Sequence, residues 1–411
     1  MIVGVVVVHG VGFVWRALLF LALAGSFSST VYLVLTLIAT ARYLRLARAA
    51  QAAASATPAS SLPPVTIFKP VHGMEEQLAA NLESFLQQDY PAYEVIFGVR
   101  DMDNPAARIA EEVRTRYPHI PSRIIVSGPP AWPNAKVFSL DKMIAASSRD
   151  YFIISDSDVR VAPDFLRNTI PPLLDPKVGL VTCMYRGIPA KDFWSWLEAL
   201  GLSVEMSSGV MVADMMEGMR FALGPAMAVR RDAIDAIGGI AAVADYYSDD
   251  FELGNRIWAK DYKVVLSHHI VFNVLTSRSP LRTLGDQLRW MKSTRYSRPA
   301  GHAGTGLTYA MPFGILGLIT AWLLGHPVLG IELFALACVN RMIQSVVVGW
   351  SVARDPRAVG LCWLYPLRDF LGFVAWAISY TSRDFYWRGE MYRFGKGGRI
   401  APLERSGSSS T

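Results

Sequence analysis

The sequence predicts an α/β domain with a parallel sheet, flanked on both sides by apolar helices. Between Val65 and Leu174, short apolar runs alternate with amphipathic helical patterns, an order typical of a parallel sheet covered by helices. Hydrophobic residues make up 52% of the 411 residues and charged residues 18%. The apolar excess lies in the N-terminal and C-terminal parts of the chain, which indicates membrane segments there.

The alternation predicts four strands, each followed by a helix. The predicted strands are Val65–Phe68, Tyr93–Val99, Ser122–Val126 and Tyr151–Ser155. The predicted helices are Glu75–Gln88, Pro105–Arg116, Lys136–Ser147 and Pro163–Leu174. Ligands of such sheets bind outside the carboxyl ends of the strands, so the residues directly after each strand are the first candidates for a functional site.

Residues 1–48 are expected to form an N-terminal transmembrane anchor. Residues 17–41 contain no charged residue, and a helix of this length covers about 37 Å, enough for a bilayer core of about 30 Å. The run is longer than the apolar region of a signal peptide and lacks a clear cleavage site. Arginines at 42, 45 and 48 follow it, which predicts a cytoplasmic location for the next domain.

Residues 49–64 are rich in Ala, Ser and Pro and are interpreted as a linker. The α/β domain is expected at residues 65–300, and membrane segments at residues 301–382. Gly306–Gly325 is a clean spanning candidate, whereas Leu333–Ala353 is weaker because it contains Asn340 and Arg341.

The last apolar segment, Ala358–Ser382, contains Arg368 and Asp369. These charges either neutralise each other or mark an interfacial segment. The tail, residues 383–411, is basic and expected to be cytoplasmic; its basic residues include Arg383, Arg388, Arg393, Lys396 and Arg399. Four full spans would put it on the opposite face. We therefore expect a multi-pass protein of the cell inner membrane in which one of the last two segments does not cross.

The net charge of +6 does not indicate a nucleic-acid partner. The basic residues cluster beside the apolar runs, a pattern that fits anionic lipid headgroups and membrane orientation. The three cysteines are far apart and lack CxxC spacing, so the sequence predicts neither a disulfide framework nor a zinc site.

Acidic residues stand directly after two of the predicted strands. Asp156 and Asp158 follow the apolar strand YFIIS, and two carboxylates at this spacing can bind a divalent cation, Mg²⁺ or Mn²⁺, that bridges the phosphates of a nucleoside diphosphate. Asp101 follows another strand and is a candidate ligand of a nucleobase or ribose, although Asp is also common before turns. Lys136 is either a phosphate contact or a solvated lysine.

A second acidic pair, Asp249 and Asp250, opens a helical pattern over Phe251–Lys260. Asp249 has a simple explanation as a helix N-cap or first-turn acid. Asp250 is the candidate general base that deprotonates an acceptor hydroxyl. A single displacement of this kind on a nucleotide sugar predicts inversion of the anomeric centre. Further along, Arg289 can stabilise a diphosphate and Trp290 can stack on a sugar, although both are also ordinary interfacial anchors.

These residues, in this order between apolar segments, resemble the ceramide glucosyltransferase family, and especially its bacterial branch that includes hopanoid glycosyltransferases. The resemblance runs from Phe68 to Arg393. Its landmarks are FKPVHG, NLESFLQQDYPAYEVIFGVRD, ISDSDVRVAPDFL, VGLVTCMYRG, AVRRDAIDAIGG, YSDDFELG, LRW and WRGEMYR.

The resemblance implies a GT-A fold, a UDP-sugar donor, a divalent metal and an inverting mechanism. It implies that Asp101 and Lys69, the latter in FKPVHG, belong to the nucleotide-sugar site together with Lys136 and Asp156. It assigns Asp156 and Asp158 to the metal and Asp250 to the base. The family's closing motif begins with Gln or Arg, but this chain has Asp286 there. Gln287 is adjacent, although on a helix it faces about 100° away.

The expected reaction moves one sugar, glucose or N-acetylglucosamine, onto the hydroxyl of a membrane lipid, ceramide or a hopanoid polyol. A processive polysaccharide synthase shares the nucleotide-binding core, but few apolar segments and Asp286 count against it. A catalytically inactive membrane scaffold or a transporter is the other alternative. A transporter would place its ionisable sites at bilayer depth, not in an α/β region.

Overall fold

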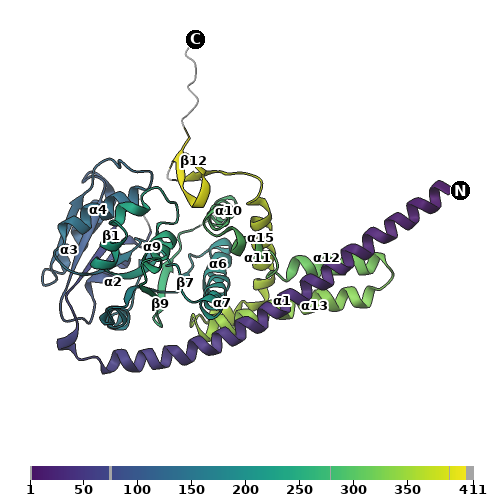
Figure 1. Ribbon diagram of the computed structural model, residues 1–411, viewed down its shortest axis with the longest axis horizontal. Coiled ribbons are helices and arrows are strands. Elements are labelled where there is room, and N and C mark those ends of the chain that lie inside the picture. Colours follow the sequence, from purple (N-terminus) through teal and green to yellow (C-terminus); the bar gives the residue numbers. More distant parts are fainter. Residues whose placement is uncertain (1, 74–75, 278, 388, 404–411) are drawn as a thin grey trace, which may run out of the picture. The chain divides into compact units, whose positions relative to one another are not determined.

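The computed structural model describes residues 2–73, 76–277, 279–387 and 389–403 (Figure 1). The chain forms two compact units, each assembled from three separate segments. The helical unit contains the segment that ends at Arg42, together with Trp196–Val212 and Ser279–Ser382. The α/β unit contains Tyr43–Ser195, Ala213–Arg278 and a third segment that begins at Arg383. Two parts of the predicted 65–300 domain, residues 196–212 and 279–300, therefore belong to the helical unit.

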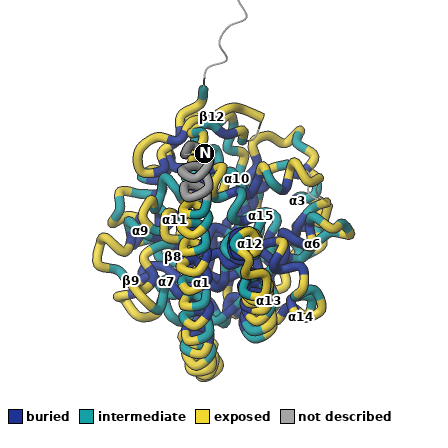
Figure 2. Tube along the Cα trace, turned by 90° about the vertical axis from the view of Figure 1, so that its right-hand side faces the viewer, coloured by how far each residue is buried: buried dark blue, intermediate teal, exposed yellow. Residues whose placement is uncertain are grey.

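The first helix, α1 (Ile2–Ala56), continues past the arginines and through the first half of the expected linker. Large apolar side chains along it are exposed, among them Phe13, Phe20 and Phe27, each at least 73%. Figure 2 colours the exposed positions of this helix yellow. Exposed apolar side chains at this density mark a surface that contacts lipid or protein. The part from Gly12 to Ala56 is long and apolar enough to cross a membrane.

The α/β unit is built on a seven-stranded sheet with the strand order β3-β2-β1-β4-β8-β6-β9. The strands are β1 (Val65–Pro70), β2 (Tyr93–Val99), β3 (Ser122–Val126), β4 (Tyr151–Ser155), β6 (Val178–Thr182), β8 (Ala226–Arg230) and β9 (Lys263–Leu266). The four predicted strands are confirmed and are parallel to one another. The antiparallel strand β8, between β4 and β6, has no counterpart among the predicted elements.

Helices follow the strands largely as predicted. They are α2 (Leu78–Leu86), α3 (Pro105–Arg116), α4 (Ala135–Ala146), α5 (Phe165–Thr169) and the 3-10 turn η2 (Pro171–Leu174). The helix predicted from Glu75 begins later, and Glu75 itself lies outside the described residues. The inner faces of the strands form an apolar core in which Phe68 packs on Phe152 with ring centroids 5.0 Å apart.

The order of the strands fixes where a ligand can bind. The chain runs outward from β1 to β2 and β3, then returns to place β4 on the other side of β1, where Val65 is in register with both Tyr93 and Tyr151. Such a reversal opens a crevice outside the carboxyl ends of the two central strands, the usual ligand position in sheets of this kind. The carboxyl ends of β1 and β4 are therefore the expected position of the site.

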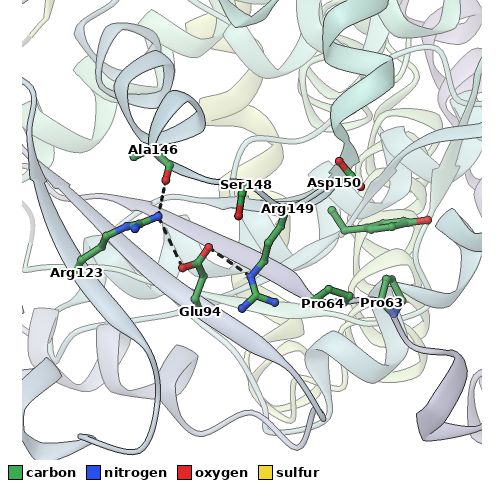
Figure 3. A pocket seen from close by; sticks show the side chains of 9 residues that line it. Pro63, Pro64, Glu94, Arg123, Ala146, Ser148, Arg149 and Asp150 are labelled. Carbon is green, nitrogen blue, oxygen red and sulfur yellow. Dashed lines mark hydrogen bonds and ion pairs between the residues drawn. The ribbon is translucent and has the colours of Figure 1, made fainter.

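A hollow of about 560 Å³ lies at the opposite edge of the sheet (Figure 3). Glu94, near the start of β2, pairs there with Arg149 at 3.4 Å and Arg123 at 3.7 Å. The remaining lining residues are Pro63, Pro64, Ala146, Ser148, Asp150 and Tyr151. Because this hollow lies at the amino ends of the strands, it is not the candidate active site.

Two smaller sheets complete the α/β unit. One contains β5 (Val159–Arg160), β10 (Val271–Val274) and β7 (Tyr185–Ile188); the other contains β11 (Asp384–Trp387), β12 (Glu390–Phe394) and β13 (Ile400–Pro402). The basic tail expected from residue 383 onward thus begins as a sheet. Arg388 and residues 404–411 of that tail lie outside the described residues.

In the helical unit, α12 (Met311–Leu323) and α13 (Pro327–Gln344) form a hairpin around Gly325, whose φ is +82°. The 13 residues of α12 rise about 20 Å, less than the bilayer core of about 30 Å. The helix in Gly306–Gly325 is thus shorter than the expected span. The segment expected to be weaker contains the longer helix: α13 and its π-helical extension η5 (Ser345–Trp350) together have 24 residues and are long and apolar enough to cross a membrane.

Glycines allow the two helices of the hairpin to approach closely. A Cβ atom at Gly314 would lie 2.5 Å from Ala337 Cβ, one at Gly317 would lie 2.7 Å from Leu333 Cδ1, and one at Gly330 would lie 2.9 Å from the Leu318 carbonyl oxygen. Small residues at such crossings allow close van der Waals packing. This packing stabilises helix pairs in lipid, where the hydrophobic effect does not hold helices together.

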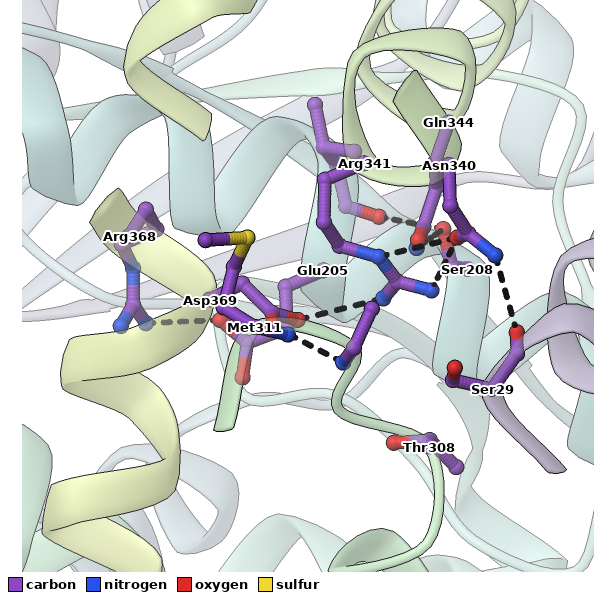
Figure 4. A network of polar contacts seen from close by, with 12 residues as sticks. Ser29, Glu205, Ser208, Thr308, Met311, Asn340, Arg341, Gln344, Arg368 and Asp369 are labelled. Atoms are coloured by element: carbon purple, nitrogen blue, oxygen red, sulfur yellow. Dashed lines mark hydrogen bonds and ion pairs between the residues drawn. The ribbon is translucent and has the colours of Figure 1, made fainter. Parts of the chain in front are cut away.

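Buried charges connect this hairpin to α15 (Tyr365–Ile378), as Figure 4 shows. Arg341, 2% exposed, lies 3.2 Å from Asp369 Oδ1, while Asp369 Oδ2 accepts hydrogen bonds from the Ala310 and Met311 amides at the start of α12. Arg368 pairs with Glu205 at 2.9 Å. Arg368 and Asp369 therefore do not neutralise each other; each is compensated by a different helix.

Replacing Asp369 with Ala should destabilise the protein strongly, because it leaves Arg341 buried without a carboxylate and removes the acceptor for two amides. Loss of one partner from a buried pair costs about 3–5 kcal/mol. Thermal unfolding of the detergent-solubilised protein measures it. The control is Arg393→Ala, which breaks the exposed pair with Asp384 and should cost less than about 1 kcal/mol. Equal losses in the two variants would contradict the argument.

Candidate active site

The site is built around the turn that follows β4. Asp156 comes directly after the last residue of that strand, and Asp158 precedes β5. Position at the end of a buried strand next to β1 brings both carboxylates to the crevice that the strand order predicts. Asp156 is 36% exposed at its side chain, which makes it the accessible member of the pair.

Asp158 is partly buried. The Val274 amide donates a hydrogen bond to its carbonyl oxygen at 2.8 Å, and the Asn273 side chain hydrogen-bonds its carboxylate. Its Oδ1 is buried and has no hydrogen-bond partner in the described part of the chain. Burial, and next the charge of Asp156, raises the pKa of Asp158 to about 6. A buried carboxylate oxygen that accepts no hydrogen bond can instead coordinate a cation.

Lys136 joins the turn to the second acidic pair. Its Nζ lies 2.8 Å from Asp156 Oδ1 and 3.2 Å from Asp249 Oδ2, and its side chain is 11% exposed. Burial disfavours the ammonium, but the carboxylates of Asp156, Asp249 and Asp250 outweigh it and raise the pKa of Lys136 above its ordinary value. The alternative of a solvated lysine is therefore wrong.

Asn134 fixes the position of this lysine. It caps α4, where its side chain accepts hydrogen bonds from the amides of Lys136 and Val137. Its Nδ2 donates to Asp249 Oδ1 at 3.2 Å and to the Tyr246 carbonyl at 2.9 Å. One side chain thus aligns the start of α4 with the start of α9 (Asp249–Trp258).

Asp249 is not the N-cap of α9, because Ser248 holds that position. Its carboxylate is held instead by Lys136 and Asn134. Asp250 follows it in the first turn, and burial, with the charge of Asp249 next in size, raises the pKa of Asp250 to about 6. The predicted base therefore lies in the same cluster of charges as the predicted metal ligands.

Two glycines bring α9 close to the turn after β4. A Cβ atom at Gly224 would lie 3.0 Å from Asp250 Oδ2 and 3.5 Å from Asp156 Oδ2, so these two carboxylates flank one stretch of backbone. A Cβ atom at Gly254 would lie 2.4 Å from the Ala222 nitrogen. Only glycine at 254 permits α9 to pack directly on the chain that leads to Gly224.

Lys69, expected in the nucleotide-sugar site, lies in the interior beside the turn that carries Asp156. Its side chain is fully buried, with Nζ 3.3 Å from Ser155 Oγ, hydrogen-bonded to the Asp156 carbonyl and 3.9 Å from the centre of the Phe85 ring. A buried ammonium in this position supports the turn that carries Asp156 from behind. Lys69 thus contacts the turn after β4 through the Asp156 carbonyl and Ser155.

The other predicted residues are dispersed. Asp101 is exposed at the carboxyl end of β2, on the same edge of the sheet as Asp156. Arg289 and Trp290 lie on α10 (Pro280–Ser297) in the helical unit. Asp286 is 2.9 Å from Arg289, one turn away. Gln287 does not replace it, because its Oε1 accepts a hydrogen bond from Arg368 in the interior of the unit.

Three residues of the site were missed by the sequence analysis: Tyr185, Asn134 and Asn273. Tyr185 is buried, and burial together with the charges of Asp250, Asp158 and Asp156 raises its pKa above the ordinary value. The capping position before a helical pattern could have identified Asn134. No local signal identifies Tyr185 or Asn273, because both lie on short strands outside the main sheet.

A divalent cation fits the donors that are present. The described residues include no group of three or more His, Cys, Asp or Glu side chains placed to hold a metal, so the protein would supply two carboxylates, Asp156 and Asp158. The orphan oxygen of Asp158 agrees with this. Mg²⁺ and Mn²⁺ sites of nucleotide-dependent enzymes commonly take the remaining ligands from phosphates and water.

Comparison with known proteins gives a consistent result. The family model of glycosyl transferase family 21 matches residues 21–400. Ceramide glucosyltransferase 3 of Caenorhabditis elegans is 22% identical over 351 residues, which cover 84% of this chain and 75% of the relative. The ceramide glucosyltransferase of Komagataella phaffii is 34% identical over 113 residues, 26% of this chain and 22% of the relative.

Among solved structures, a mannosyltransferase from Pyrobaculum calidifontis in complex with GDP-Man and Mn²⁺ is 16% identical with a TM-score of 0.48, covering 86% of this chain and 98% of that one. The structure of Staphylococcus aureus TarS with UDP-GlcNAc is 12% identical with a TM-score of 0.35, covering 83% and 99%.

The family model extends over both units, from within α1 to β13, and includes every residue of the carboxylate cluster. The chain therefore belongs to glycosyl transferase family 21 and is a glycosyltransferase.

Proposed function

We propose that the protein transfers one sugar, glucose or N-acetylglucosamine, from a UDP-sugar to the hydroxyl of a membrane lipid, ceramide or a hopanoid polyol. The observation that carries this proposal is the cluster of Asp156, Asp249 and Asp250 around Lys136, with Asp158 beside Asp156, at the carboxyl ends of the strands. Membership of family 21 and the ceramide glucosyltransferase relatives support the lipid acceptor.

The donor half of the reaction is assigned to the carboxyl ends of β2 and β4. Asp101 accepts hydrogen bonds from the nucleobase or ribose, and Asp156 and Asp158 hold the divalent cation. A cation held there would supply positive charge to the diphosphate leaving group. Lys136 already pairs with Asp156, and an incoming diphosphate would compete for its ammonium.

The acceptor half is assigned to Asp250. Its carboxylate takes the proton of the lipid hydroxyl, whose oxygen attacks the anomeric carbon while UDP departs from the opposite face, so an α-linked donor gives a β-linked product. A general base works best when its pKa lies near the working pH. Burial brings the pKa of Asp250 to about 6, closer to neutrality than an ordinary aspartate.

The helical unit is assigned to the lipid. Arg289 is proposed to stabilise the diphosphate, and Trp290, 38% exposed, to stack on the sugar or to line the acceptor entrance. The stretches Gly12–Ala56 and Pro327–Trp350 are long and apolar enough to cross a membrane. We place the protein in the cell inner membrane as a multi-pass protein with its α/β unit in the cytoplasm, because arginines follow the first apolar run.

Replacing Asp250 with Asn should lower kcat by at least about 100-fold, because the amide cannot accept the hydroxyl proton, while its shape leaves the cluster intact. Sugar transfer to the lipid by the solubilised enzyme measures kcat. The matched control is Asp261→Asn, an exposed aspartate beyond the end of the same helix, which should retain full activity. Full activity of Asp250→Asn would exclude this base.

A chelator should abolish transfer, and Mg²⁺ or Mn²⁺ should restore it, because two carboxylates alone do not hold the diphosphate. The assay supplies labelled UDP-glucose or UDP-N-acetylglucosamine with ceramide or bacteriohopanetetrol. A lipid carrying one sugar supports the proposal and identifies both substrates. A polymer would point to a processive synthase, and no turnover of either donor would favour an inactive scaffold.

A further inference from the structure

The C-terminal sheet, residues 384–402, contacts the segment that leads directly to Asp250. The Ile400 amide donates to the Asp245 carbonyl at 2.8 Å, and the Tyr247 amide donates to the Gly398 carbonyl at 3.3 Å. Tyr246 and Arg399 form an antiparallel bridge between these hydrogen bonds. The backbone of residues 245–247 is therefore paired with a segment about 150 positions later in the chain.

The side chains of the two tyrosines strengthen this pairing. The Tyr246 hydroxyl accepts hydrogen bonds from Arg399 Nε and from Arg256 Nη2, each at 3.1 Å. Both guanidinium groups also lie over the Tyr246 ring, at 5.6 Å and 5.3 Å from its centre. Arg256 belongs to α9, so Tyr246 links the C-terminal sheet to the helix that carries Asp250.

Tyr247 packs into an aromatic cluster of the same sheet. Its ring centroid lies 5.2 Å from that of Trp387, 5.3 Å from Phe385 and 5.6 Å from Phe394. Phe385 and Phe394 stack on each other at 4.2 Å. Aromatic pairs at these separations contribute to stability beyond the effect of their buried area. Three of these pairs include Tyr247, which lies three positions before Asp250.

On the other side, Asn134 holds the same segment from α4. Its amide donates to the Ala244 carbonyl at 3.0 Å, and its side chain donates to the Tyr246 carbonyl. The segment thus lies between the helix that carries Lys136 and the C-terminal sheet. Both sets of contacts involve residues 244–247, shortly before Asp250.

We propose that the C-terminal sheet is a positioning element of the active site: through Tyr246 and Tyr247 it sets the place of Asp250, and Trp387 and Arg399 are positioning residues for the transfer step. This inference rests on the proposed function, because it takes Asp250 to be the base. Displacement of a catalytic group by about 1 Å can cost about a hundredfold in rate. The sheet is expected to affect kcat more than donor binding, since the contacts described above lead to residues 245–247, directly before Asp250.

The test compares single variants of the full-length solubilised protein. Trp387→Ala removes a ring that packs on Tyr247 and should lower kcat about ten- to hundredfold, whereas binding of UDP with Mn²⁺ should stay within about twofold. Trp387→Phe keeps an aromatic ring there and should restore most of kcat. Arg399→Ala, which removes one donor to the Tyr246 hydroxyl without opening the aromatic cluster, should lower kcat in the same direction.

The matched control is Tyr386→Ala. Tyr386 is the neighbour of Trp387 on the same strand, but it is 63% exposed and points to the opposite face of the sheet. Its loss should leave kcat unchanged, as should replacement of its cross-strand partner Met391.

The outcomes separate this inference from the proposed function. If Asp250→Asn is inactive while Trp387→Ala and Arg399→Ala retain wild-type kcat, the positioning role is overturned and the base assignment stands. If kcat and UDP binding fall together, with an equal loss in Trp387→Phe, the sheet only stabilises the fold and the inference also fails. If Asp250→Asn keeps full activity, the proposed mechanism itself fails.

Discussion

Four aspartates buried or half-buried at one edge of a sheet impose the electrostatic constraint on which the α/β unit depends. Carboxylates taken out of water repel one another and protonate unless cations compensate them. Lys136 compensates two of them directly, and Lys69 supports the turn from behind. The glycines at 224 and 254 and the cap at Asn134 then serve one purpose, which is to hold these charged side chains close together.

Much of this could be predicted because it is local. Strands β2, β3 and β4 coincide with apolar runs, and the position of Asp156 and Asp158 after a buried strand follows from that register. The direction of a side chain is not local. Lys69 and Lys136 both carry an ammonium near this edge, yet one lies behind the sheet's turn and the other between two carboxylates. The position of the Lys69 ammonium depends on the turn after β4, and that of the Lys136 ammonium depends on α9. Both of these elements are remote in sequence from the lysine they hold.

The apolar segments show the same division. Hydropathy identifies which stretches are apolar, but a positive φ at Gly325 ends one helix early and begins a hairpin. Arg341 weakens the hydropathy signal of the segment that contains α13. Its partner Asp369 lies 28 residues away, outside that segment, so the pairing is not visible in local hydropathy. Asp286, unusual for its motif, is paired with Arg289. For Arg341 and Asp286, an oppositely charged partner lowers the free-energy cost of placing the charge where it lies. Composition alone does not identify such partners.

The interleaving of the two units has a consequence for biosynthesis. The segment that pairs with residues 245–247 is translated only after α10, α12, α13 and α15. Domains generally fold as units in the order in which the chain emerges, but this α/β unit has to wait for its last strands. During synthesis the loop before Asp250 is unpaired on one side until the helices of the other unit have left the ribosome. Completion of the α/β unit is thereby coupled to synthesis of the helical unit.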